Sequence, residues 1–187
     1  LQTGITHDFE LIAHKNERAC AVTPLRRLQT NDIVVFDRGY FSYLLLHQYC
    51  EQKIDCIFRI QNVRINRDIQ QFVNSDDTDI IISYRPSEPT KSEIKKQGHR
   101  IDCRAIKLRL IKAIISGSVV IYATTLLSQA YSSRSIIDLY YSRWGIEEHY
   151  KTSKRSLEVE SFHSKSERGV RQELFANFVW ISIVRFF

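Results

Sequence analysis

The fold is decided by the stretch Ile33-Val-Val-Phe-Asp-Arg-Gly-Tyr-Phe-Ser42. Its opening run is apolar and mostly β-branched, a pattern typical of a buried central strand. The run ends at Asp37 and Gly39, so we predict that the strand opens there into a turn. Polar side chains therefore gather at the carboxyl end of the strand, where open α/β sheets place their active sites.

The flanking segments extend this strand into a larger pattern. Residues 42–50 have helical character, and Asp55–Ile60 has the character of a following strand. A short strand at residues 9–13 and a helix at residues 16–28 are predicted upstream. This succession indicates an α/β sheet, and we predict that residues 1–60 form the first part of its core.

The pattern changes between residues 61 and 117. Residues 80–84 and 104–110 show β character, the second with apolar and basic side chains in alternation. Between them, residues 86–93 form a polar stretch that is predicted to be a mobile loop. We therefore predict a mostly β insertion.

Core-like elements return after this insertion. Residues 119–126 have strand character, and residues 132–157 form a predicted long helix with a start signal at Ser132. A helix at residues 168–187 follows. No internal repeat is visible, so we interpret the chain as one interrupted domain that residues 118–187 complete.

The composition limits the possible partners. The chain has 27 Lys and Arg and 21 Asp and Glu, with a formal net charge of +6. This balance favours a polyanionic partner, although an ordinary basic domain would show it too. The four cysteines include no C-x-x-C pair and indicate reduced thiols of a cytoplasmic protein. The longest apolar stretches fall far short of the roughly 20 residues that span a bilayer, so no membrane role is expected.

A second group of polar residues lies on the predicted helix at 132–157. Four side chains share one face, because they fall within an arc of roughly 60° when each residue turns by about 100°. They are Tyr140, Arg143, Glu147 and Lys154. A core-facing stripe with these charges is unusual for a structural helix.

Two structural explanations remain open at this point. Glu147 and Lys151 are spaced as a plain i, i+4 ion pair on a helix surface. Asp37 is a common type of turn residue before a glycine. Neither residue identifies a functional site by itself.

Taken together, the two groups match one family. The spacing Tyr140-(2)-Arg143-(3)-Glu147-(6)-Lys154 reproduces a Y-(2)-R-(3)-E-(6)-K signature, and Asp37-Arg-Gly-Tyr-Phe-Ser42 resembles the D-R-G-Y-x-S block of the same family. The chain resembles DDE transposases of the insertion sequence four group. The resemblance implies an α/β ribonuclease H-like core, with a mostly β insertion between the second and third metal-binding carboxylates.

The resemblance also implies the chemistry of the site. Asp37 would be the second catalytic, metal-binding carboxylate and Glu147 the third, and the complete enzyme would hold two Mg²⁺ or Mn²⁺ ions. Tyr140, Arg143 and Lys154 would bind DNA phosphates near the cut. The expected partners are the DNA of transposon ends and target and other copies of the chain in a synaptic complex. The expected location is the prokaryotic cytoplasm, on the nucleoid when DNA is bound.

Basic residues of the insertion are further candidates for contact with the DNA backbone. A strand face exposed to solvent is the simpler explanation of these residues. They are Arg64, Arg67, Arg100, Arg104, Lys107 and Arg109.

The first carboxylate of the family pattern has no clear counterpart. It belongs on an N-terminal strand well before the aspartate block, and Asp8 is the only obvious candidate in the segment before Asp37. Asp8 adjoins a segment that the family pattern would put on an edge strand, which makes it a poor one. The chain also has no methionine and ends inside an apolar helical run. We therefore predict a truncated fragment that is inactive alone.

The sequence leaves two functions open. The first is metal-dependent strand cleavage and strand transfer of an insertion sequence. The alternative is a catalytically dead remnant that only binds DNA or a full-length transposase subunit. An unrelated ribonuclease H-like nuclease is disfavoured by the arginine and lysine spacing around Glu147.

Overall fold

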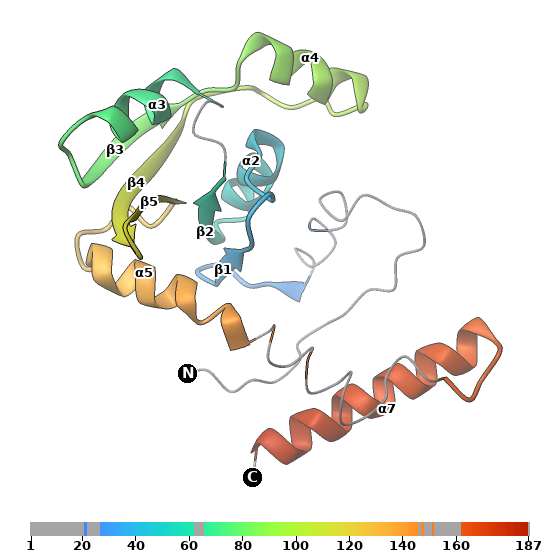
Figure 1. The fold of residues 1–187 in the computed structure, drawn as a ribbon. Coiled ribbons are helices and arrows are strands. Elements are labelled where there is room, and N and C mark those ends of the chain that lie inside the picture. Colours follow the sequence, from blue (N-terminus) through green and yellow to red (C-terminus); the bar gives the residue numbers. More distant parts are fainter. Residues whose placement is uncertain are drawn as a thin grey trace. The chain divides into compact units, whose positions relative to one another are not determined.

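A computed structural model describes residues 21, 27–61, 66–145, 147, 151 and 162–186 of the chain. Its first elements are β1 (Ile33–Phe36), α2 (Tyr43–Glu51) and β2 (Asp55–Ile60). The predicted succession of strand, helix and strand is confirmed (Figure 1). The strand predicted at 9–13, most of the helix predicted at 16–28, Asp8 and Lys154 lie outside the described residues.

Five strands form one mixed sheet in the order β1-β2-β5-β4-β3. The further strands are β3 (Asp79–Tyr84), β4 (Ile106–Ile115) and β5 (Ser118–Thr124). β1 and β2 pair in parallel, and the other pairs are antiparallel. A parallel pair needs a crossover connection, which α2 supplies. This mixed α/β architecture confirms the predicted fold class and is consistent with a ribonuclease H-like core.

The central position predicted for β1 is not seen among the described strands. Among the described strands β1 lies at the edge of the sheet and is not central. Three of its residues are half-buried, and only Phe36 is buried. An apolar, β-branched run predicts a strand, but it does not determine how many neighbouring strands will pair with it.

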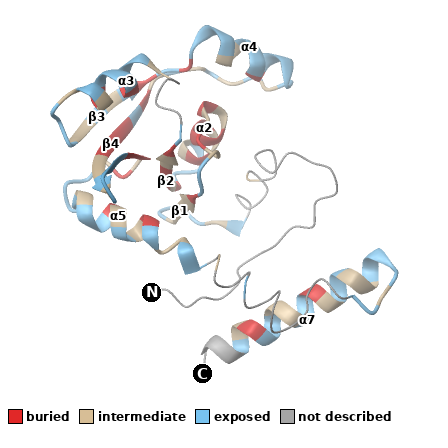
Figure 2. Ribbon diagram, in the orientation of Figure 1, coloured by how far each residue is buried: buried red, intermediate tan, exposed pale blue. Residues whose placement is uncertain are grey.

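The sheet separates two apolar clusters, because successive side chains of a strand point to opposite faces. Phe58 of β2 belongs to the cluster that includes the buried side of α2. Its neighbour Ile57 belongs to the other cluster, with Tyr122 of β5 and with Ile136 of α5 (Ser133–Tyr141). In Figure 2, the buried residues, drawn in red, accordingly lie on α2, in the middle of the sheet and on one side of α5.

The region from 61 to 117 contains helices as well as the predicted strands. β3 and β4 confirm the two stretches of β character, and both extend the same sheet as β1 and β2. Between the strands lie α3 (Arg67–Asn74), which precedes β3, and α4 (Glu88–Lys96), which follows it. The boundaries of the insertion, at 61 and 117, remain a prediction.

The mobile loop predicted at residues 86–93 is wrong, because α4 begins inside it. Ser87 is the N-cap of this helix and accepts a hydrogen bond from Thr90 N at 3.4 Å. Pro89 stands in the first turn, where proline is tolerated. Ile94 is buried and anchors the helix. Serine and proline occur at helix starts as well as in loops. In this segment they begin a helix.

The described residues divide into two compact units. Those up to Tyr140 belong to the first unit, which holds the whole sheet. Those from Tyr141 onward belong to the second, which holds α7 (Glu167–Phe186). This helix confirms the predicted final helix.

Three of the four cysteines lie among the described residues. Cys50, Cys56 and Cys103 are free thiols. Burial is the main cause that raises the pKa of Cys50, to about 11, and burial also raises the pKa of Cys56. Within the described part of the chain, no helix has the length and apolar character to cross a membrane.

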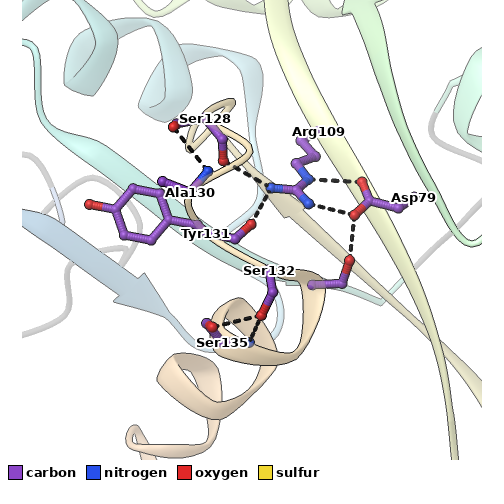
Figure 3. Close-up of polar contacts among 8 residues, drawn as sticks. Asp79, Arg109, Ser128, Ala130, Tyr131, Ser132 and Ser135 are labelled. Carbon is purple, nitrogen blue, oxygen red and sulfur yellow. Dashed lines mark hydrogen bonds and ion pairs between the residues drawn. The ribbon is translucent and has the colours of Figure 1, made fainter.

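A buried ion pair joins β3 and β4 to the start of α5 (Figure 3). Arg109 is only 6% exposed, and its guanidinium donates two hydrogen bonds to the carboxylate of Asp79, at 2.8 Å and 2.6 Å. The remaining nitrogen donates to the backbone oxygens of Tyr131 at 2.8 Å and Ser128 at 3.4 Å. Ser133, the first residue of α5, donates its hydroxyl to Asp79.

This network corrects the interpretation of Arg109 as a residue that tracks DNA or faces solvent. All three of its nitrogens are used inside the protein, because a buried guanidinium is costly without complete pairing. Arg104 forms an ion pair with Glu51 on the surface. The other basic candidates among the described residues are exposed, and they are Arg67, Arg100 and Lys107. Arg64 lies outside the described residues.

The Asp79–Arg109 pair makes stability depend on pH. The hydrogen bonds from Arg109 lower the pKa of Asp79 below its ordinary value. A carboxyl group with a lowered folded pKa stabilises the protein above its unfolded pKa, and the effect is lost as pH falls through the folded pKa. Asp79→Asn should therefore reduce the free energy of unfolding by about 3 kcal/mol at neutral pH. The difference from wild type should shrink below about pH 4.

Urea unfolding of both proteins across this pH range measures the effect. Asp138→Asn is the control, because Asp138 belongs to an exposed pair with Arg134 and its loss should cost little. A gap between wild type and Asp79→Asn that stays constant with pH would contradict the prediction.

Candidate active site

Asp37 is the first residue after β1, and its side chain is exposed. Its backbone oxygen accepts a hydrogen bond from Tyr40 N at 3.4 Å, which closes a turn. Its Oδ1 accepts a bond from Arg38 N at 2.6 Å. The predicted turn is confirmed. The carboxylate is thus held at the carboxyl end of a strand while still reaching solvent.

The other residues of the aspartate block build the loop around it. Gly39 has a φ of 89°, a left-handed conformation that favours glycine. Phe41 is buried, and its ring centroid lies 5.4 Å from that of Phe58. Ser42 caps α2 by accepting a backbone hydrogen bond at 3.3 Å within the first turn. Each of these three residues therefore has a local structural reason that helps to fix the position of the aspartate.

Tyr140 lies inside the protein. It is 2% exposed and packs on Tyr122 of β5, with ring centroids 5.0 Å apart. Ile136, one turn earlier on α5, is fully buried beside it. The predicted core-facing direction is thus confirmed for these two helix residues. The phosphate contact assigned to Tyr140 remains a prediction. The hydroxyl group is the part of its side chain that would make this contact.

Tyr122 is a residue of this region that the sequence analysis missed. It is 1% exposed and occupies the second apolar cluster with Tyr140. The signal was weak, because a tyrosine in the middle of an apolar strand is expected as ordinary core. Its contact with Tyr140 depends on how the sheet and α5 pack.

The long helix predicted over residues 132–157 is wrong in one respect. It begins as expected, since the Ser132 hydroxyl accepts a hydrogen bond from Ser135 N at 3.1 Å. However, α5 ends at Tyr141, and a turn comes next in which Gly145 N donates to Ser142 O at 3.1 Å. After this turn, the described residues Trp144, Gly145, Glu147 and Lys151 are helical again, as predicted. The directions of the side chains after this turn therefore cannot be calculated from Tyr140 by a constant rotation of about 100° per residue. Periodicity alone cannot reveal a turn that the backbone makes with ordinary residues.

Arg143 and Glu147 form an ion pair in the segment after α5. The distance from Arg143 Nη2 to Glu147 Oε1 is 2.9 Å. The Arg143 side chain is 12% exposed, and the Glu147 side chain is 42% exposed. The ion pair of Glu147 is therefore made with Arg143, four residues before it. The plain ion pair proposed with Lys151 is not the one observed.

The acidic candidates belong to different units, Asp37 to the first and Glu147 to the second. Their sharing of a metal ion remains a prediction. Both side chains reach solvent and offer the hard oxygen donors that suit Mg²⁺ or Mn²⁺. Across the described part of the chain, no group of three His, Cys, Asp or Glu side chains gathers in the manner of a complete metal site.

Comparison with known families gives one result. The family of the transposase DDE domain matches residues 1–182, which is nearly the whole chain. No curated protein matches the chain. The match includes the turn that carries Asp37 as well as the segment with Arg143 and Glu147, and the mixed sheet agrees with it. The chain therefore belongs to the transposase DDE domain family.

Proposed function

We propose that the chain carries part of the catalytic centre of an insertion sequence four group transposase. The reaction would be metal-dependent cleavage of a DNA strand, followed by transfer of the free 3′ hydroxyl to target DNA. The observation that carries the proposal is the setting of Asp37. Its exposed carboxylate is held at the carboxyl end of a strand by a glycine-dependent turn, and polar sites of α/β sheets occur at that edge.

Asp37 and Glu147 would hold the metal through their carboxylate oxygens. Family membership implies action on DNA with divalent metal ions. When bound, such ions supply an activated water and stabilise the leaving oxygen of the phosphodiester. The chain's own part is to fix the ligands, and the turn at Gly39 does this for Asp37.

Arg143 would bind a DNA phosphate while it remains near Glu147. A guanidinium presents its N–H donors in a planar fork that matches the oxygens of a phosphate. The pair also gives Arg143 a fixed orientation, since its side chain is largely buried. Lys154 would add a point charge. We propose cytoplasmic action at the nucleoid and assembly of several copies on DNA.

A second candidate is a chain that binds DNA without cutting it. The signature assigns only two carboxylates, Asp37 and Glu147, and two carboxylates do not fix two metal ions in the geometry that hydrolysis needs. This candidate and the first share the same DNA-binding residues. They differ in whether strand cleavage occurs.

A nicking assay distinguishes the two candidates. The chain is incubated with Mg²⁺ or Mn²⁺ and a supercoiled plasmid that carries its own gene with flanking DNA. We expect no relaxed or linear product, which would assign the second candidate to this chain by itself, because two carboxylates do not fix two metal ions. Nicking that disappears in Glu147→Gln would show instead that another residue completes the site, and Asp8 would be the first to test.

Metal binding tests whether Asp37 and Glu147 serve one site. Asp37→Asn and Glu147→Gln should each weaken Mn²⁺ binding by about tenfold or more, because each removes a direct ligand. The double variant should lose no more than the stronger single variant. Electron paramagnetic resonance of free Mn²⁺ measures these affinities, and Asp138→Asn, an exposed carboxylate on α5, serves as control. Additive losses would mean two separate sites and would contradict the proposal.

The salt dependence of DNA binding tests the basic residues. Binding should weaken linearly on a log-log plot, with a slope of about −0.9 for each phosphate neutralised. Arg143→Ala and Lys154→Ala should each flatten the slope by about that amount. Arg134→Ala is a matched control, because Arg134 forms the same kind of i, i+4 pair on an exposed helix surface. Slopes equal to wild type would give Arg143 and Lys154 a structural role only.

A further inference from the structure

β3 forms an open edge of the sheet among the described strands. On its other side it pairs with β4, where Lys112 N donates to Thr78 O at 2.8 Å. In an antiparallel pair, opposite residues that exchange both backbone hydrogen bonds alternate with opposite residues that exchange none. The odd-numbered residues Asp79, Ile81 and Ser83 therefore direct their backbone N–H and C=O groups away from β4, toward the open edge.

This edge lacks the features that usually keep edge strands from pairing. Natural edge strands carry lysine, proline or a bulge. β3 has the sequence Asp-Ile-Ile-Ile-Ser-Tyr in continuous register with β4, and its one carboxylate, that of Asp79, is bound by Arg109. Ile81 is 49% exposed, whereas the residues of β1, at the opposite edge, are buried or half-buried. An exposed apolar edge strand can add a further strand to its sheet.

The strand is complementary to itself. When two copies pair in antiparallel orientation about an axis at Ile81, the two Ile81 side chains lie directly opposite each other, and Ile80 lies opposite Ile82 of the second copy. Ile80 and Ile82 pack against the cluster that includes α2, and Ile81 lies on the other face of the sheet, opposite Arg109 of β4. Both faces of the joined sheet thus gain apolar cross-strand pairs, which stabilise a sheet.

Charged residues at the two ends of β3 favour the same register. Asp77 and Arg85 are exposed, and each lies four positions from Ile81, so the alternation of the strand puts all three on one face. In this register Asp77 of each copy lies opposite Arg85 of the other, which gives two pairs of opposite charge. Asn66 donates to Arg85 O at 3.4 Å, so the backbone pairing ends before Arg85 and the ion pair is made by side chains. A shift by two residues would put Ile81 opposite a polar residue.

We propose that β3 is an interface at which two copies of the chain pair edge to edge, in antiparallel orientation about a two-fold axis at Ile81. Such a contact is isologous, so every cross-strand pair occurs twice and the assembly closes at two copies. The interface goes beyond the proposed function, because it needs neither DNA nor a metal ion. The charges of Asp77 and Arg85 favour a second copy as the occupant, since a strand of another protein would need both charges at the same spacing.

Sedimentation equilibrium of the full chain, without DNA or metal and over a range of concentrations, tests the interface. We expect a monomer–dimer equilibrium. Ile81→Lys should raise the dissociation constant about tenfold or more, because it puts two like charges opposite each other at the axis. Ile114→Lys is the matched control, because Ile114 is 77% exposed on β4 and lies outside the proposed interface. Circular dichroism confirms that both variants fold.

Exchange of the end charges tests the register and leaves the core unchanged, since both side chains are exposed. Asp77→Arg and Arg85→Asp should each raise the dissociation constant about fivefold or more, because each sets like charges opposite one another in both pairs. The double variant Asp77→Arg/Arg85→Asp should recover the wild-type constant, because opposite charges face each other again.

Oxidative cross-linking locates the axis. Ile81→Cys should give a covalent dimer, because directly opposite residues in this register have Cα atoms about 5.5 Å apart, within the range of a disulfide. Ser83→Cys is the control on the same face of the strand. Its two copies would lie four positions apart along the joined strands, about 13 Å, which is too far for a disulfide.

The outcomes separate this interface from other occupants and from the proposed function. A wild-type chain that stays monomeric at high concentration would overturn the interface and point to a strand of another protein. Equal dissociation constants for wild type and Ile81→Lys would overturn it in favour of a different surface. A double charge variant that does not recover would overturn the register, and assemblies that grow without limit would overturn the closed dimer. Strand cleavage and Mn²⁺ binding are measured separately, so the proposed function can fail without the interface.

Discussion

The parallel pairing of β1 with β2 is the constraint on which the proposed site depends. Stacking of Phe36 on Phe58 fixes the register on the face of α2, because a slip by one residue would turn every side chain to the wrong face. Asp37 follows directly after Phe36, at the carboxyl end of β1. A core contact thus fixes the end of the strand from which the aspartate projects.

The antiparallel half of the sheet has a different role, which is to fix the start of α5. Arg109 joins β4 to Asp79 of β3 and to the loop before α5, so strands and helix are tied by one buried group. α5 then lays Tyr140 on Tyr122. The first residue of the family signature is therefore held by packing. The residues from Ser142 onward are held by their own local contacts, which include the ion pair of Arg143.

One of the two carboxylates has an arginine beside it, since Arg143 Nη2 lies 2.9 Å from Glu147 Oε1. Metal-dependent cleavage of DNA brings cations and phosphates to the same point, so carboxylates and guanidinium groups are needed side by side. The carboxylates would hold the metal, and Arg143 would hold a phosphate. This division of roles is the physical content of the proposed function.

The sequence by itself determined most of the elements and the family. Strand periodicity, the helix start at Ser132 and the spacing around Glu147 are local properties, and these are what a linear pattern contains. It did not determine the helix α4, where serine and proline permit either a loop or a helix start. Only the tertiary structure decided that Arg109 is buried and paired with Asp79, and that Tyr140 packs on Tyr122. Both facts come from contacts between different strands and helices, which no local pattern encodes.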